Sequence, residues 1–196
     1  MAENALRGQF CHKNSGRGWY PSLPGGAEVA ILSAVDFSFE HHFDADLPTV
    51  AEAILNEDYQ RSLDGIEPLK KRELLDQVEK GNGRVVRRTR CVLGTDLGAA
   101  KRFLGDADPA WIEEATWNPA GSRWEWVIQP EVAGELLSSH GTMELLDKGD
   151  QTLRRVTGVV KIKVPLYGGR VEGWIVQGLE QAYAGEAERL ASWLER

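Results

Sequence analysis

Apolar and polar residues alternate most clearly between Val35 and Phe43, in the stretch "VDFSFEHHF". Phe37, Phe39 and His41 share one face with the two end residues, and acidic, serine and histidine residues occupy the other. A period of two is typical of a strand with one buried face. The pattern therefore predicts a half-buried β-strand over residues 35–43.

The next stretch, residues 44–63, changes to helical spacing. Asp46 stands where a helix N-cap is expected, and Pro48 suits the first helical turn. The apolar positions form two short faces, one on each side of Asn56. We therefore expect two short helices after the first strand.

Six further strands are predicted from segments separated by turns rich in Gly, Asn and Pro. The clearest hairpin turn is "KGNGR" at 80–84, because Asn and Gly tolerate positive φ. Residues 96–109 interrupt the series, with room for one helical turn. The predicted strands are residues 67–80, 85–93, 110–119, 123–132, 135–149 and 151–165. Long antiparallel strands joined by short turns should form one curved sheet.

A long helix is predicted to close the chain. From Arg170 onward apolar residues recur at steps of three and four, which gives one apolar face. About 25 residues at 1.5 Å each make a rod of roughly 38 Å, which matches the width of about seven strands at just under 5 Å each. Pro165 should end the last strand, and Gly168 and Gly169 should permit the corner before the helix. Such a helix rarely seals a concave sheet fully, and the remaining gap can form a pocket.

Residues 1–34 differ from the rest of the chain. They are rich in Gly, Pro and Ser and show no period of 2 or 3.6, so we expect a flexible N-terminal extension. An alternative is a mis-assigned start, which sequencing of the native N-terminus would test. Residues 35–196 are the predicted domain.

Composition narrows the classes of function. The 196 residues are 42% hydrophobic and 27% charged, which is ordinary for one globular domain. The net charge of −7 argues against nucleic acid as a partner, because phosphate binding needs a basic surface. Basic residues do cluster at 85–90 and 153–156, and we interpret both runs as the solvent-exposed face of a strand.

Two cysteines, Cys11 and Cys91, are too few for a disulfide framework and have no zinc-ligand spacing. No glycine-rich phosphate motif is present either. We therefore expect no metal and no cofactor. No apolar run reaches the roughly 20 residues of a membrane span, and the run at 29–35 lacks the features of a signal peptide. A cytoplasmic location and no integral membrane segment are expected, and the oligomeric state stays open.

The predicted order of elements, β-α-α-β6-α, resembles the START-like superfamily, also called SRPBCC or helix-grip. This superfamily includes pathogenesis-related allergens, START lipid-transfer domains, polyketide cyclases and aromatases. "KVPLYGGRVEGWIVQGL" (163–179), followed by "EAERLASWL" (186–194), resembles more closely a bacterial family of unknown function within it. Members share a Pro-hydrophobic-x-Gly-Gly-x-x-Glu stretch before the last helix. The resemblance covers about residues 35–195 and implies an α+β helix-grip fold, with the last helix across the concave face of the sheet.

Tryptophan is unusually frequent, with seven in the chain. Trp124 and Trp126 share one strand face, and large aromatic residues on a concave sheet suit an apolar ligand cavity. The alternative is that they only fill the core. His41 is either a core histidine with its hydrogen bonds satisfied or a polar anchor for a ligand. The predicted ligand-binding residues are Phe37, Phe39, His41, Trp117, Trp124, Trp126, Met143, Trp174 and Gly178.

No catalytic residue is predicted. A serine hydrolase would need an activated serine and an oxyanion hole, and no GxSxG motif is present. Glu113 and Glu125 lie on or beside the tryptophan-bearing faces. A buried glutamate there would need a partner or a raised pKa, and would point to function. We expect both at the solvent-exposed edge.

Three hypotheses follow. The first is a carrier or sensor that binds a hydrophobic or amphipathic, lipid-like small molecule between sheet and helix. The second is an enzyme of the aromatase or cyclase kind, which a buried residue with a perturbed pKa in the pocket would favour. The third is an interaction module, which a pocket filled by tryptophan side chains would favour.

Overall fold

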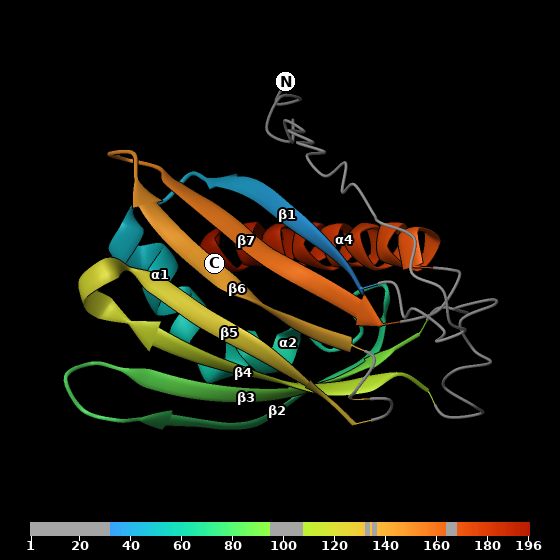
Figure 1. The fold of residues 1–196 in the computed structure, drawn as a ribbon. Coiled ribbons are helices and arrows are strands. Elements are labelled where there is room, and N and C mark those ends of the chain that lie inside the picture. Colours follow the sequence, from blue (N-terminus) through green and yellow to red (C-terminus); the bar gives the residue numbers. More distant parts are fainter. Residues whose placement is uncertain (1–31, 95–107, 132–133, 135–136, 164–167) are drawn as a thin grey trace, which may run out of the picture.

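A computed structural model shows one curved antiparallel sheet with helices on a single face (Figure 1). The structure describes residues 32–94, 108–131, 134, 137–163 and 168–196. The strands are β1 (Leu32–Phe43), β2 (Leu69–Glu79), β3 (Val85–Leu93), β4 (Ala110–Asn118), β5 (Arg123–Pro130), β6 (Leu137–Asp147) and β7 (Thr152–Lys163). Their order across the sheet is β1-β7-β6-β5-β4-β3-β2, so β1 and β2 form the edges. The predicted fold class is confirmed.

The predicted alternation in β1 is confirmed. Phe37 and Phe43 are buried, while Asp36, Ser38 and Glu40 are exposed. The strand pairs along its whole length with β7, the last strand of the sheet in sequence. This pairing makes β1 the edge strand on the side where the C-terminal helix lies (Figure 1).

Helices α1 (Leu47–Leu55) and α2 (Glu57–Ser62) follow β1, as predicted. The Asp46 side chain caps α1 by accepting a hydrogen bond from the Thr49 backbone N–H at 2.9 Å. Asn56 ends α1 and caps α2, because its side-chain oxygen accepts from the next helix's first N–H groups. Both helices lie on the same face of the sheet as the C-terminal helix, where α1 contacts β6 and α2 contacts β2 (Figure 1).

Helix α4 (Gly168–Leu194) has 27 residues and packs against β1 and β7. It begins two residues before the predicted start, so the glycine pair forms its first turn. Ala187 and Leu190 near its end are buried, whereas Ile175 and Leu179 further back are only half-buried. The helix therefore packs most tightly over its C-terminal third. The predicted corner at Pro165 lies outside the described residues.

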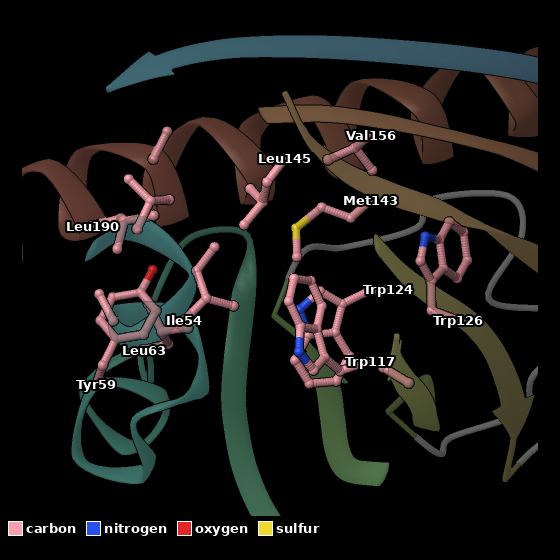
Figure 2. Packing of buried hydrophobic residues seen from close by; sticks show 14 of the residues in the cluster. Ile54, Tyr59, Leu63, Trp117, Trp124, Trp126, Met143, Leu145, Val156 and Leu190 are labelled. Atoms are coloured by element: carbon pink, nitrogen blue, oxygen red, sulfur yellow. The ribbon is translucent and has the colours of Figure 1, made fainter. Parts of the chain in front are cut away.

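The core fills the space between the helices and the concave face (Figure 2). Trp117, Trp124 and Met143 project from β4, β5 and β6 toward α1, α2 and α4. Tyr59 and Leu190 meet them from the helical side. The candidate site lies within this layer.

Candidate functional site

A cavity of about 40 Å³ lies between the concave face and helices α1, α2 and α4. Its lining is mixed, because charged and polar side chains stand next to apolar ones. The lining residues are Ile54, Tyr59, Gln60, Leu63, Arg72, Arg87, Glu113, Ala115, Trp124, Trp126, Met143, Arg154, Tyr183 and Glu186.

Three arginines reach this cavity from separate strands: Arg72 from β2, Arg87 from β3 and Arg154 from β7. Their exposed fractions are 5%, 5% and 1%, so all three guanidinium groups are inside the protein. Charged residues are rarely buried this far without partners. Each of the three guanidinium groups therefore needs partners inside the protein, and these partners make up the candidate site.

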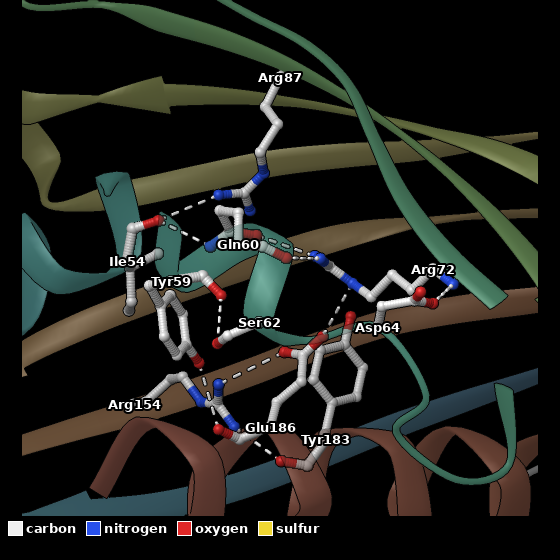
Figure 3. Close-up of polar contacts among 10 residues, drawn as sticks. All are labelled: Ile54, Tyr59, Gln60, Ser62, Asp64, Arg72, Arg87, Arg154, Tyr183 and Glu186. Atoms are coloured by element: carbon white, nitrogen blue, oxygen red, sulfur yellow. Dashed lines mark hydrogen bonds and ion pairs between the residues drawn. The ribbon is translucent and has the colours of Figure 1, made fainter. Parts of the chain in front are cut away.

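Arg72 is held by the second short helix (Figure 3). Its two terminal nitrogens donate to the Gln60 backbone oxygen at 3.0 Å and to the Gln60 Oε1 atom at 2.9 Å. Its Nε atom lies 3.8 Å from a carboxylate oxygen of Glu186 on α4. The Gln60 amide in turn donates to the Ile54 carbonyl at 2.7 Å. Arg72 thus links β2, α2 and the long helix.

Arg154 connects β7 to β1 and α4. One terminal nitrogen donates to the Tyr183 backbone oxygen at 2.9 Å and lies 3.3 Å from the Nδ1 atom of His41. The other lies 3.6 Å from Glu186. Burial, and then the Arg154 charge, lower the pKa of His41 to about 3. A neutral ring can accept at Nδ1 when its proton is on Nε2.

Arg87 differs from the other two because no described carboxylate lies within ion-pairing distance of it. It donates to the Ile54 carbonyl at 3.2 Å, near the negative end of the α1 dipole. Its guanidinium also lies over the Trp124 ring, 4.3 Å from the centroid. Burial and the nearby Arg72 lower the pKa of Arg87 to about 10, which leaves it charged at neutral pH.

Two glutamates face the arginines. Glu186 sits between Arg72 and Arg154 (Figure 3). Glu113 lines the cavity from β4, and burial raises the pKa of its carboxyl although Arg72 and Arg87 act in the opposite sense. The expectation of a solvent-exposed edge was therefore wrong for Glu113. It holds for Glu125, which is exposed and paired with Arg123.

Two tyrosines complete the polar wall. The Tyr59 hydroxyl donates to the Glu186 backbone oxygen at 3.2 Å. Burial, as the largest cause, raises the pKa of Tyr59 and that of Tyr183 above the ordinary range for tyrosine. Both hydroxyls therefore stay protonated and act as hydrogen-bond donors or acceptors.

Of the predicted ligand-binding residues, Trp124, Trp126 and Met143 line the cavity. Phe37, Phe39 and Trp117 pack beside the lining instead: Phe37 stacks on Trp126 with ring centroids 6.1 Å apart, and Trp117 lies 5.6 Å from Trp124. Phe39 contacts the ring of Tyr183 at 5.9 Å.

The other three predicted residues fall into different places. His41 touches the site through Arg154. Gly178 lies on α4, where an added Cβ would meet Pro68 at 3.7 Å, and it is not among the lining residues. The side chain of Trp174 lies outside the described part of the structure.

Sequence reasoning missed the arginines. The two basic runs were interpreted as exposed strand faces, which is right for Arg88 and Arg155; each pairs with a carboxylate on a neighbouring strand. It is wrong for Arg87 and Arg154. Alternation was the available signal, since Arg154 shares its face with the fully buried Val156.

No three or more His, Cys, Asp or Glu side chains of the described residues are grouped to hold a metal ion. Among the described helices, none is long and apolar enough to cross a membrane.

Seven antiparallel strands curved around a long C-terminal helix, with two short helices after the first strand, define the START-like (SRPBCC, helix-grip) fold. Solved structures share it. Norcoclaurine synthase from Thalictrum flavum is 12% identical with a TM-score of 0.60, over 93% of this chain and 99% of that one. The Zhui aromatase/cyclase from Streptomyces sp. R1128 is 14% identical with a TM-score of 0.56, over 85% and 95%. A START superfamily protein from Mycobacterium smegmatis is 16% identical with a TM-score of 0.50, over 79% and 98%.

At these identities the likeness shows the fold alone. The family is shown by sequence: the model described as "Protein of unknown function (DUF2505)" matches residues 38–194, and the chain belongs to this family. A comparison with curated protein sequences finds no match.

Proposed function

We propose that this domain binds an amphipathic small molecule between the concave face of its sheet and helix α4. The observation that carries the proposal is the mixed lining of the cavity. Trp124, Trp126 and Met143 offer apolar contact, while Arg87, Arg154 and other polar groups lie on the same wall. Ligand sites in proteins combine a mostly apolar wall with a few placed polar groups.

The size of the cavity limits how a ligand would lie. A volume of about 40 Å³ leaves room for a few water-sized groups, since about 10–15 Å³ is enough to hold one water molecule. The apolar part of a larger ligand needs α4 to move away from the sheet. The half-buried Ile175, Val176 and Leu179 offer it an apolar surface on the less tightly packed part of that helix.

Native mass spectrometry of protein purified from its own host tests the proposal. We expect a non-covalent adduct that solvent extraction releases, and binding of the neutral dye Nile red after extraction. Protein that carries no adduct and binds no hydrophobic probe would contradict it.

A matched pair of variants locates the site. Ala115 lines the cavity, so Ala115→Val should fill most of it and weaken binding at least tenfold. Thr116 is next to it and points to the other face of the strand, so Thr116→Val should bind like wild type. Equal binding by both variants would place the ligand elsewhere.

A second candidate function is acid–base catalysis on a bound ligand. Glu113 favours it, because the carboxyl lines the cavity and burial raises its pKa, as is common for acid–base groups of active sites. The cavity is lined by charged groups rather than filled by tryptophan rings, so the interaction-module hypothesis has no comparable support.

The co-purifying molecule also tests this second function. Incubated in excess with the protein, it should be converted to a product of different mass or to an isomer separable by chromatography. Glu113→Gln should abolish conversion and retain binding. If wild-type protein returns the molecule unchanged, the catalytic candidate falls and the binding proposal stands.

A further inference from the structure

Several buried hydrogen-bond donors in residues that line the cavity have no acceptor among the described residues. They are the Nε atoms of Arg87 and Arg154 and the Nε1 atoms of Trp124 and Trp126. All four side chains are more than nine-tenths buried and line the same cavity. Guanidinium and indole nitrogens donate and never accept. A buried donor without an acceptor is costly, so a group with acceptor atoms bound beside these side chains would stabilise the site.

The balance of charges at the cavity also favours a ligand with a negatively charged group. Three guanidinium groups face two carboxylates, Glu113 and Glu186. Glu186 is shared by Arg72 and Arg154. Burial raises the pKa of Glu113, which acts against a negative charge on this carboxyl. His41 adds no positive charge, because its pKa is lowered to about 3. Positive charge is in excess at the cavity, and Glu113 and Glu186 attract Arg87 from beyond ion-pairing distance.

Arg87 is stabilised in part by its neighbours. The Ile54 carbonyl and the Trp124 ring each attract a cation. Neither carries a full negative charge, and buried ions in proteins are normally paired with one. The competing explanation is that these two contacts and water suffice for Arg87. The two explanations differ in what a ligand's charge should do to its affinity.

We propose that the molecule bound here is a carboxylic acid, whose carboxylate is held by Arg87 and the unpartnered Nε atom of Arg154 while its apolar part lies toward α4. This inference rests on the proposed function. A planar guanidinium matches a carboxylate and a phosphate equally well in charge-assisted hydrogen bonds. The small cavity favours the flat carboxylate, which needs less room than a tetrahedral phosphate.

Isothermal titration of the full chain with matched probes tests the inference. The probes are straight-chain carboxylates of six to twelve carbons, the alcohols of the same lengths, and the corresponding alkyl phosphates, all at about pH 7.5. We expect the best carboxylate to bind roughly tenfold or more tightly than its alcohol, as a charge-assisted contact would give. An alcohol that binds as tightly as its carboxylate overturns the inference. A phosphate that binds more tightly than the carboxylate overturns the choice of head group.

Two neighbouring arginines supply the variants. Arg87→Met should lower carboxylate affinity at least tenfold and leave alcohol affinity unchanged. Arg88→Met should leave both unchanged, because Arg88 lies on the outer face and pairs with Asp76. Equal carboxylate binding by both variants overturns the role of Arg87. If Arg87→Met does not fold, Arg87→Lys, which keeps the charge and loses the fork, should bind the carboxylate with intermediate affinity.

The outcomes separate this inference from the function on which it rests. If carboxylates and alcohols bind equally well, the binding function stands and the anionic ligand is wrong. If no probe of any class binds and no molecule co-purifies, the binding function itself is wrong. The wild-type comparison of carboxylate with alcohol needs no variant.

Discussion

At the scale of single residues, Glu186 is the shared carboxylate partner of two buried arginines. Its carboxylate oxygens lie 3.8 Å from Arg72 and 3.6 Å from Arg154, too far for good hydrogen bonds. The attraction is therefore mainly Coulombic, and it acts where solvent screens poorly because both arginine side chains are almost fully buried. Loss of the carboxylate leaves two buried cations without their shared partner.

Glu186→Gln should lower the free energy of unfolding by on the order of 2–3 kcal/mol, since breaking a buried ion pair from one side is costly. Glu188→Gln, two residues further along the helix and exposed, should change it by less than about 0.5 kcal/mol. Urea unfolding at neutral pH measures both. Equal stability of the two variants would show that the arginines find other compensation.

His41 should make stability depend on pH in the acid range. Burial and Arg154 hold its pKa at about 3 in the folded chain, against 6.5 for an ordinary histidine. Between these values the unfolded chain binds a proton that the folded chain does not, so stability falls as the pH drops from about 6.5 toward 3. The Glu113 contribution has the opposite sign: its pKa is raised on folding, so it favours the folded state at low pH and this contribution is lost as pH rises.

Comparison of variants isolates the histidine. His41→Gln should flatten the fall in stability between pH 6.5 and 4, as measured by urea unfolding at several pH values. His42→Gln, on the exposed face of the same strand, should keep the wild-type profile. If His41→Gln keeps the wild-type dependence of stability on pH, the pKa of His41 does not differ between the folded and the unfolded chain.

The residues that line the site were only partly predictable. Alternation placed Trp124 and Trp126 on the concave face, because large apolar residues at every second position leave little ambiguity. By the same alternation, the side chains of Arg87 and Arg154 face the interior. Residue type argued against it, since isolated charged residues belong at the surface. Inside the protein, Arg87 donates to the Ile54 carbonyl and Arg154 donates to the Tyr183 carbonyl. These partners are far away in the sequence, so the sequence pattern does not reveal them.

At the scale of secondary-structure elements, two glycines shape the middle of the sheet. Gly141 on β6 and Gly158 on β7 are register partners. The Trp126 ring covers both, and the Phe37 ring covers Gly158. A Cβ on Gly141 would lie 2.5 Å from Trp126 and would also clash with the Thr157 carbonyl. The aromatic wall can approach the sheet this closely only because no side chains stand beneath it.

Gly141→Ala should therefore destabilise the domain by roughly 2 kcal/mol or more, the range of overpacked cores, and lower Tm by about 5 °C. Gly173→Ala is the matched control. It lies on exposed helix, where a Cβ meets nothing within 4 Å, so the better helix propensity of Ala should stabilise by about 0.5–1 kcal/mol. Thermal unfolding followed by circular dichroism measures both. A Tm for Gly141→Ala at or above wild type would contradict this packing.

Element positions were well predicted because their signals are local. Asp46 and Asn56 cap their helices through side-chain hydrogen bonds within three residues. The turn at Asn82 uses positive φ, as the "KGNGR" sequence indicated. Tightness of packing was not predictable. The apolar face of α4 continues past Ile175, yet its fully buried residues lie in the last third, where Tyr59 and Ser62 of α2 contact it.

At the scale of the whole molecule, the size of the cavity is set by how far α4 lies from the sheet. Gly185 influences that distance, since a Cβ there would lie 2.8 Å from Ile66. The spacing of apolar residues predicts which face of α4 turns toward the sheet. It does not predict the distance between α4 and the sheet. The fold and its class were therefore predictable, while the small volume and charged wall of the site were not.

The boundary of the domain gives the last prediction. All described elements lie within residues 32–196, and the family match covers residues 38–194. Deletion of residues 2–30 should leave Tm within about 2 °C of wild type. Deletion of residues 2–35 should lower it clearly, because β1 would lose the pairing of Val35 with Val160, which is fully buried. Thermal unfolding of both chains decides the matter. If the shorter deletion lowers Tm as much as the longer one, the N-terminal extension is part of the domain, and its contacts help to hold β1 at the edge of the sheet.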